Sequence, residues 1–333
     1  MKILVIQTAF IGDVILATPV FREIVRCKPE AQLDVLVRNG NEGLLQNFPG
    51  ISTIFTWDKK KGKYPTLLRL LKKIRAEKYD YVFNLQRFGA TGLLTAFSGS
   101  KNKIGFDKNP FSAFYTQRVA HQIGEDRYIH ETSRNLELIL DFGANNTTKP
   151  ILYPTSADYA KVKPLQEENY ICFAPTSVWF TKQLPSEKWI ELIVRIRETG
   201  FSGMIYLLGG PGDNEDCQKI LSASQDLSVK NLAGKLSFLQ TAALMKGAKM
   251  NYVNDSAPLH IASAMNAPVT VFFCSTVPSF GFGPLSDVSF IIEHSNLSCR
   301  PCGLHGYREC PQKHFRCALD LNMKNASDVL KHA

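Results

Sequence analysis

The feature that most constrains the fold of this 333-residue chain is a repeated alternation of short apolar runs with amphipathic segments. Short runs rich in β-branched and aromatic residues are typical of buried strands, and apolar residues spaced three or four apart are typical of helices. Strand, helix and parallel strand in succession form the unit of an open α/β sheet. The predicted strands are 2–6, 33–37, 81–85, 170–173, 204–208, 250–253 and 269–273, and the predicted helices are 11–27, 66–75, 189–198, 213–222, 238–246 and 258–265.

This alternation is interrupted once. Residues 145–169 are rich in Asn, Thr, Pro, Lys and Glu and show little periodicity. The chain is also long enough for two domains of about 150 residues each. We therefore predict two Rossmann-like, doubly wound α/β domains, at 1–155 and 165–315, that face each other across a cleft. A tail or helix at 316–333 follows them.

Composition narrows the class of protein. With 44% hydrophobic and 21% charged residues, the chain can bury sizeable cores and is not a disordered sequence. No apolar run approaches the roughly 18 residues of a membrane span. The apolar stretch at the start of the chain resembles a signal peptide, but it is too short, and Gly12 and Asp13 interrupt it. We therefore expect a cytoplasmic enzyme.

The net charge of +9 is concentrated in one window. Residues 58–78 hold nine basic and two acidic side chains, a net charge of +7; the basic ones are Lys59, Lys60, Lys61, Lys63, Arg69, Lys72, Lys73, Arg75 and Lys78. Such a patch attracts nucleic acid, anionic lipid or phosphorylated saccharide, although many charge runs are simply solvated helix faces. Nucleic-acid binding is disfavoured, because the chain has no evident aromatic-rich RNA-binding motif.

The segment 252–265 is the strongest candidate for a ligand site. A β-type run ends in Asn254-Asp255-Ser256, and a helix of small residues that contains His260 follows at once. The N-terminus of such a helix presents free backbone N–H groups that favour an anion such as a diphosphate. Asp255 would either cap the helix or hold a sugar hydroxyl.

A carboxylate follows the first predicted strand. Gly12 permits a tight turn there, and Asp13 would stand at the carboxyl end of the strand, where open α/β sheets bind ligands. Asp13 would then be a general base for a sugar hydroxyl. The alternative is that it caps the following helix.

Two further turns follow strands of the second half. The loop 174–185 offers the hydroxyls of Thr176, Ser177 and Thr181 and the ammonium of Lys182 to a phosphate, or is an ordinary polar loop. The glycine-rich turn 207–215 allows close approach of a ligand to the backbone. Its carboxylates at Asp213 and Glu215 would bind ribose hydroxyls, or would favour the helix N-terminus that follows.

The end of the chain concentrates cysteine. Four of the eight cysteines, Cys299, Cys302, Cys310 and Cys317, lie within nineteen residues. In a cytosolic protein such clustering favours metal over disulfide, although the spacing is uneven for a zinc ribbon. A structural zinc site, free or partly oxidised thiols, and an iron–sulfur cluster remain as alternatives.

Together these residues resemble glycosyltransferase family nine, the heptosyltransferases of bacterial lipopolysaccharide synthesis, whose fold is GT-B. The resemblance covers nearly the whole chain, and the segment 254–260 is its most specific mark. The matching positions are 1–6, Gly12-Asp13, 17–19, 175–177, Trp179, Thr181-Lys182, Leu184-Pro185, Gly209-Gly210, Asp213, 231–234, 254–260, Ala262, and the tail residues Cys299, Cys302, Cys310, Pro311, His314 and Cys317. Ala257 departs from the family, which usually carries Gly there.

The resemblance implies an inverting, metal-independent transfer of heptose from ADP-heptose to an inner-core acceptor built on Kdo and lipid A. It makes Asp13 the catalytic base and Lys182 a catalytic group on the diphosphate. The implied donor-binding residues are Thr176, Ser177, Thr181, Lys182, Gly210, Asp213, Leu236, Asp255, Ser256, Ala257, Pro258, Leu259 and His260. The acceptor-binding residues assigned beside them are Lys59, Lys60, Lys61 and Arg87.

No cofactor is expected for catalysis, and a structural zinc at the cysteines would have no catalytic role. The basic window would bring the enzyme to the inner face of the inner membrane without insertion. The alternatives are transfer from another nucleotide sugar, or epimerisation of a nucleotide sugar by an enzyme of similar fold.

Overall fold

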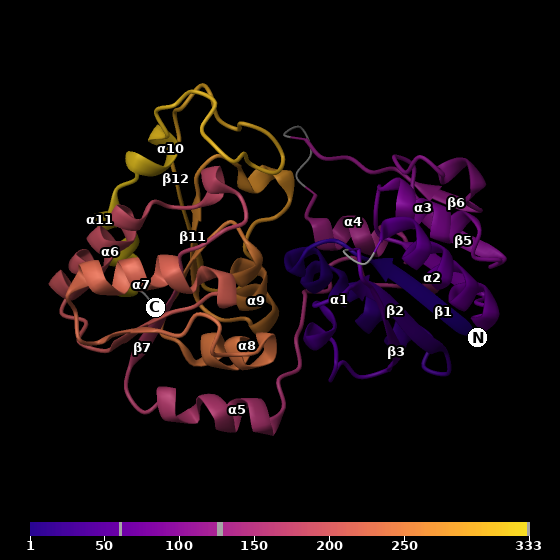
Figure 1. The fold of residues 1–333 in the computed structure, drawn as a ribbon, viewed down its shortest axis with the longest axis horizontal. Coiled ribbons are helices and arrows are strands. Elements are labelled where there is room, and N and C mark those ends of the chain that lie inside the picture. The colour runs from indigo at the N-terminus through magenta and orange to yellow at the C-terminus, as the bar shows by residue number, and fades with distance from the viewer. Residues whose placement is uncertain (60–61, 125–128, 332–333) are drawn as a thin grey trace. The chain divides into compact units, whose positions relative to one another are not determined.

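The computed structural model describes residues 1–59, 62–124 and 129–331 (Figure 1). The chain forms two compact units, Met1–Tyr153 and Pro154–Ala333. In the described part of the chain, each unit contains one six-stranded sheet, and all the strand pairs are parallel. No helix among these residues is long and apolar enough to cross a membrane.

The first unit is a doubly wound sheet with strand order β3-β2-β1-β4-β5-β6. Its central strand β1 pairs with β2 on one side and β4 on the other, and the chain reverses its direction of travel across the sheet at this point. The strands are β1 (Lys2–Gln7), β2 (Gln32–Arg38), β3 (Ile51–Trp57), β4 (Tyr81–Asn84), β5 (Asn102–Phe106) and β6 (Gln117–Val119), and the helices are α1 (Ile11–Cys27), α2 (Lys63–Glu77), α3 (Gly89–Ala96) and α4 (Glu131–Glu137).

Alternation along the strands divides the core of the first unit. Leu4 and Ile6 of β1 pack in one cluster with Leu67 and Leu70 of α2 and with Leu94 of α3. Successive side chains of a strand point to opposite faces, so the equally buried Ile3 and Val5 serve the other face. Helices α2 and α3 pack together, as do α1 and α4.

The long helix α1 contains a proline without ending at it. Pro19 has no N–H, so the carbonyl of Ile15 loses its usual helical partner. The hydroxyl of Thr18 donates to that carbonyl at 2.7 Å, and the N–H of Ile151 donates to the same hydroxyl at 3.0 Å. The prediction of one continuous helix over 11–27 is therefore confirmed.

The second unit repeats the topology of the first, with strand order β12-β11-β10-β7-β8-β9. Its central strand β7 pairs with β10 and β8. The strands are β7 (Tyr170–Ala174), β8 (Met204–Leu207), β9 (Val229–Asn231), β10 (Asn251–Asn254), β11 (Val269–Phe273) and β12 (Ser289–Glu293), and the helices are α5 (Ser156–Val162), α6 (Ser186–Glu198), α7 (Asn214–Ser224), α8 (Phe238–Gly247), α9 (Ala257–Met265), α10 (Arg316–Leu319) and α11 (Met323–Asp328).

The end of the chain belongs to the core of the second unit. Helix α11 packs against α6. Figure 1 shows both helices on the same side of the sheet as α7. Cys317, Met323 and Leu330 are buried in one cluster with Trp189 of α6. The hydroxyl of Tyr252 in β10 also donates to the carbonyl of Ala326 at 3.1 Å. The terminal segment is thus held both by apolar packing and by a buried hydrogen bond.

The segment 145–169, expected to be aperiodic, contains helix α5. Its start is fixed by a reciprocal pair of hydrogen bonds: Asp158 Oδ2 accepts from the N–H of Thr155 at 2.8 Å, and Thr155 Oγ1 accepts from the N–H of Asp158 at 3.2 Å. This capping box stabilises a short helix that the low apolar content did not predict.

Candidate active site

Each sheet has a switch point, the place at its central strand where the strand order reverses. In the first unit it lies between β1 and β4, and in the second between β7 and β10. Ligands of open α/β sheets bind outside the carboxyl ends of the strands at such points. Asp13 follows β1 at the first of these points, and Lys182 and Asp255 follow β7 and β10 at the second.

Asp13 lies in the first turn of α1, directly after β1. It is half-buried, and its Oδ2 accepts a hydrogen bond from the backbone N–H of Phe10 at 3.2 Å. The carboxylate therefore supports the start of the helix, as the capping alternative required. A carboxylate with two oxygens can accept this bond and still take a proton, so both roles remain open to the same side chain.

Two of the predicted acceptor residues come to the same switch point. Lys59, which follows β3, donates to the carbonyl of Thr8 at 2.8 Å, and its ammonium lies 4.8 Å from the centroid of the Trp57 ring. The hydroxyl of Thr8 donates to Gln86 at 2.7 Å, which fixes the loop that carries Arg87 after β4. Lys60 and Lys61 lie outside the described residues.

The sequence analysis did not predict a buried ion pair near Arg87. Arg134 of α4 donates to Glu131 at 2.8 Å, and both side chains are buried. Burial raises the pKa of Glu131, although the positive charges of Arg134 and Arg87 oppose that shift. Burial, with the same two arginines, lowers the pKa of His121 to about 4, so this imidazole is neutral at pH 7. The helical spacing of Glu131 and Arg134 was the available signal.

The centre of the second switch point is an ion pair. Lys182 Nζ lies 2.7 Å from Asp255 Oδ2, and the two side chains are 16% and 5% exposed. The hydroxyl of Thr276, which follows β11, donates to the same carboxylate oxygen at 2.6 Å. Two donors on one oxygen fix both the carboxylate and the ammonium, because charge-assisted hydrogen bonds are short and directional.

Asn254 holds both ends of the β7–α6 loop, which carries Lys182. Its amide nitrogen donates to the carbonyl of Pro175 at 2.9 Å, and its Oδ1 accepts from the N–H of Leu184 at 3.0 Å. Helix α9 begins directly after it, with Ser256 as N-cap and Ala257 and Pro258 as the first two helical residues. The methyl group of Ala257 imposes no backbone strain, because the φ angle of Ala257 is not positive.

The glycine-rich turn after β8 is closed by its carboxylate. Asp213 Oδ2 accepts from the N–H of Gly210 at 2.7 Å. Gly234, with φ of +74°, lies so close to Pro211 that an added Cβ would meet its Cα at 2.9 Å. Leu236 is half-exposed in the same turn, just before α8. The turns that follow β8 and β9 are thus packed against each other.

Thr181 differs from the prediction that its hydroxyl binds the donor. The side chain is 1% exposed. Its Oγ1 accepts from the N–H of Tyr307 at 2.7 Å and from the hydroxyl of Ser275 at 3.0 Å. The hydroxyl is therefore used inside the protein, and it anchors the backbone that carries Lys182. The side chains of Leu259 and His260, also predicted to bind the donor, are likewise buried.

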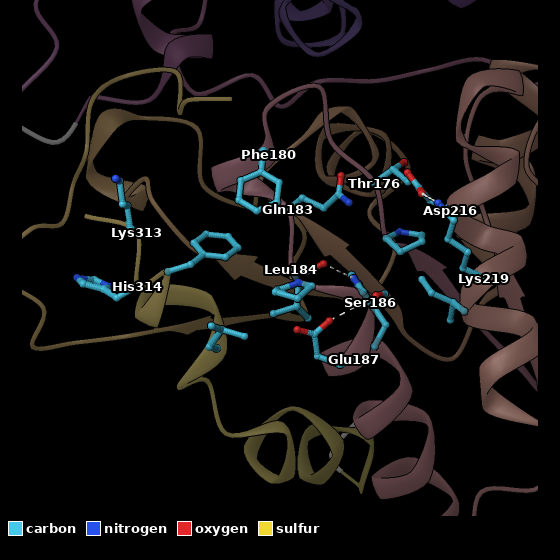
Figure 2. A pocket seen from close by; sticks show the side chains of 16 residues that line it. Thr176, Phe180, Gln183, Leu184, Ser186, Glu187, Asp216, Lys219, Lys313 and His314 are labelled. Carbon is cyan, nitrogen blue, oxygen red and sulfur yellow. Dashed lines mark hydrogen bonds and ion pairs between the residues drawn. The ribbon is translucent and has the colours of Figure 1, made fainter. Parts of the chain in front are cut away.

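A pocket of about 490 Å³ adjoins the β7–α6 loop in the second unit. Figure 2 shows it between that loop, with Thr176 and Gln183, the α7 residues Asp216 and Lys219, and the segment of His314. Lys219 pairs with Asp216 at 3.1 Å, so these opposite charges satisfy each other. Thr176 is the one predicted donor residue among the described side chains that line it, which places the pocket beside the ion pair and not at it.

The cysteine-rich segment does not form a metal site in the described part of the chain, where no group of three or more His, Cys, Asp or Glu side chains is arranged to hold an ion. All four thiols are free, and Cys299 Sγ lies 3.8 Å from His314 Nε2. Burial raises the pKa of Cys317 to about 12 and also raises that of Cys302. The predicted zinc site is therefore not confirmed.

Two Rossmann-like units with polar groups gathered at their switch points define a two-domain α/β enzyme of the GT-B class. A family model described as glycosyltransferase family 9 (heptosyltransferase) matches residues 67–312, which is most of the chain. The chain therefore belongs to glycosyltransferase family 9, and the family predicted from the sequence is confirmed.

Individual relatives agree with this family. Lipopolysaccharide heptosyltransferase 3 of Escherichia coli is 28% identical over 282 residues, which cover 80% of this chain and 82% of the relative. Lipopolysaccharide heptosyltransferase 2 of E. coli K12 is 24% identical over 312 residues, 88% of each chain. The solved structure of E. coli ADP-heptose lps heptosyltransferase II has a TM-score of 0.77 at 22% identity and covers 100% of both chains, which supports the fold.

Proposed function

We propose that this chain transfers heptose from ADP-heptose to the inner core of lipopolysaccharide, with inversion at the anomeric carbon and without a metal or other cofactor. Family membership and the names of the relatives support this reaction class. The observation that carries the donor site is the ion pair between Lys182 and Asp255 at the N-terminus of α9. It combines a cation, backbone N–H groups and a carboxylate, which is what a diphosphate-linked sugar requires.

In the donor half of the reaction, the bond between the anomeric carbon and the diphosphate breaks, and ADP leaves. Negative charge grows on the diphosphate as this happens. Lys182 and the backbone N–H groups of Ser256 and Ala257 meet that charge, because a helix N-terminus and an ammonium both favour anions. Asp255 Oδ2 is held by Lys182 and Thr276, and we assign its Oδ1 to a hydroxyl of the heptose. Asp213 takes the ribose, and Leu236 lies against the adenine.

In the acceptor half, Asp13 removes the proton from the acceptor hydroxyl as the oxygen bonds to the anomeric carbon. Attack from the face opposite the diphosphate inverts the configuration. Lys59 and Arg87, together with Lys60 and Lys61, supply positive charge for the carboxylate and phosphate groups of an acceptor of Kdo and lipid A. The contacts of Lys59 with Thr8 and of Thr8 with Gln86 bring Lys59 and the loop of Arg87 to the strand end that carries Asp13.

Such an acceptor is anchored in a bilayer, so we propose that the enzyme works in the cytoplasm at the inner face of the inner membrane, as a peripheral protein. The exposed cations of α2 support this assignment, because each basic residue near an anionic surface contributes about 1 kcal/mol of attraction. Nucleic acid is not part of the proposed function.

A screen of nucleotide sugars by calorimetry, followed by transfer onto truncated inner-core acceptors, tests this function. We expect ADP-heptose to bind and to lose its heptose only when an acceptor is present. ADP-mannose and UDP-glucose serve as matched donors that differ in the sugar or the base. Conversion of ADP-heptose in the absence of acceptor would establish the epimerase alternative, and efficient transfer from another donor would overturn the assignment of heptose.

We expect Thr276→Val to weaken ADP binding about three- to tenfold, because loss of one hydrogen bond to a charged group is worth a kilocalorie per mole or more. The carboxylate of Asp255 would lose a fixed donor, and Lys182 would lose the fixed position of its partner. Thr276→Ser keeps the hydroxyl and should stay near the wild type. Calorimetric titration with ADP measures all of these variants.

Thr270→Val is the matched control for this substitution. Thr270 is as buried as Thr276, at 0% against 1% exposure, and its hydroxyl contacts Met250 Sδ at 3.2 Å. A threonine hydroxyl is thus removed from the same unit without touching Asp255. Equal losses of ADP affinity in both valine variants would show a general effect on packing and would refute the specific role of Thr276.

A further inference from the structure

Three phenylalanines form an exposed cluster on the first unit. Phe97 ends α3, and Phe111 and Phe114 lie in the turn that follows β5. Their ring centroids are 5.9 to 6.4 Å apart, so each ring contacts the other two. Phe97 and Phe114 are nevertheless 43% and 55% exposed. Single exposed apolar residues are normal on a protein surface, but a contiguous group marks an interaction site.

One stripe of α2 borders this cluster. Leu68, Lys72 and Arg75 are four and three residues apart, so they lie on the same side of the helix. All three are exposed, and Leu68 is 58% exposed although it is apolar. Arg75 Nη1 donates to the carbonyl of Phe97 at 3.3 Å. The contact places the stripe directly beside the phenylalanines.

Two further cations belong to the segments that carry these rings. Lys103 of β5 extends toward the carbonyl of Ala96, at 3.5 Å, just before Phe97. Lys108 is exposed in the loop that leads to Phe111. An apolar centre with a cationic border matches the boundary of an anionic bilayer, where aromatic rings lie at the headgroup level and lysines and arginines contact lipid phosphates.

We propose that the phenylalanine surface, defined as Leu68, Phe97, Phe111 and Phe114 with the border of Lys72, Arg75, Lys103 and Lys108, docks the first unit on an anionic lipid bilayer. The border favours this occupant over a second copy of the chain, because two such borders brought together would repel each other. At the opposite end of α3, Phe88 is 64% exposed and directly follows Arg87, so the surface leads toward the proposed acceptor site.

The inference rests on the proposed function in that a lipid-linked acceptor requires the enzyme to reach a membrane. Binding to vesicles is therefore measured without donor or acceptor, and transfer is measured with a water-soluble truncated acceptor. The function fails if the wild type does not transfer heptose. The docking proposal is tested by vesicle binding alone, and the result of the transfer assay does not affect it.

The experiment compares co-sedimentation with phosphatidylcholine vesicles and with vesicles that also contain phosphatidylglycerol. We expect the wild type to prefer the anionic vesicles, and we expect Phe97→Ser combined with Phe114→Ser to lower its partition about tenfold or more. Lys72→Glu with Arg75→Glu should have a similar effect that shrinks at high salt. Both double variants should keep transfer to the soluble acceptor.

The matched controls lie on the second unit. Val194→Ser with Leu227→Ser removes two apolar side chains that are 52% and 98% exposed, and Arg195→Glu with Lys219→Glu reverses two exposed charges of α6 and α7. The controls should bind vesicles like the wild type. Equal losses in controls and test variants would overturn the proposal. A dimer that sedimentation velocity detects in the wild type and not in the phenylalanine variant would also overturn it, in favour of a second copy.

Discussion

Replacing Asp13 by Asn should lower the turnover number of heptose transfer about 10²–10⁴-fold, the usual cost of losing a general base. The amide has nearly the same shape as the carboxylate but cannot accept the proton of the acceptor hydroxyl. ADP binding should stay unchanged, because the groups assigned to the diphosphate belong to the second unit. Steady-state kinetics with a truncated acceptor and titration with ADP measure the two effects separately.

The competing role of Asp13 is structural, since its carboxylate accepts the N–H of Phe10 at the start of α1. Asp158 provides the matched control. It occupies the same third position of its helix and accepts the N–H of Thr155 at 2.8 Å. Asp158→Asn should therefore reproduce any loss of helix capping, about 1 kcal/mol or less, without the loss of rate. An Asp13→Asn enzyme that transfers heptose at the wild-type rate would exclude Asp13 as the base.

The two switch points differ in how far the sequence could predict them. The local sequence pattern predicted β1 with α1 and β10 with α9, because a buried strand that is followed at once by a helix has a clear pattern. The pairing of Lys182 with Asp255 joins residues that are far apart in the chain, and no periodicity carries such information. The resemblance assigned both residues to the donor but did not predict that they contact each other. The structure shows that contact, at 2.7 Å.

Edge strands escaped prediction for a physical reason. Strand β3 has exposed positions at Ser52, Thr53 and Thr56, and β12 is likewise only partly buried. A strand with one neighbour needs few apolar residues, so its sequence lacks the continuous apolar run that marks a central parallel strand. Thr276 was missed because it lies in a loop after β11, where burial depends on distant segments. Its hydrogen bond to Asp255 exists only once the sheet has formed.

The sequence also did not predict which aromatic residues are exposed. The sequence places Phe97, Phe111 and Phe114 near each other, yet phenylalanine is usually a core residue, and the basic window alone suggested an anionic partner. Their exposure in one contacting cluster beside Arg75 becomes visible only when α2 and α3 pack together. The basic window thus gains an apolar counterpart, which explains attraction to a bilayer better than charge alone.

Replacing Lys182 by Met should lower turnover about 10²–10³-fold, as loss of one group that stabilises developing negative charge does in other enzymes. The same change leaves the carboxylate of Asp255 buried without its cation, so the second unit should lose on the order of 1–3 kcal/mol of stability. Adding Asp255→Asn removes the unpaired charge. We expect this second change to restore much of the stability and none of the rate, because the diphosphate still lacks its ammonium partner.

Lys188→Met is the control that separates these effects from the loss of any partly buried lysine. Lys188 is exposed to the same 16% as Lys182 and pairs with Glu191 at 3.0 Å in the same unit. Glu191 remains 38% exposed, so water can solvate it when its partner is removed. Thermal unfolding and single-turnover kinetics are measured on the wild type, Lys182→Met, Asp255→Asn and their double variant, which form a double-mutant cycle, and on Lys188→Met as the control. Recovery of the rate together with the stability in the double variant would mean that Lys182 only neutralises Asp255 and does not act on the leaving group.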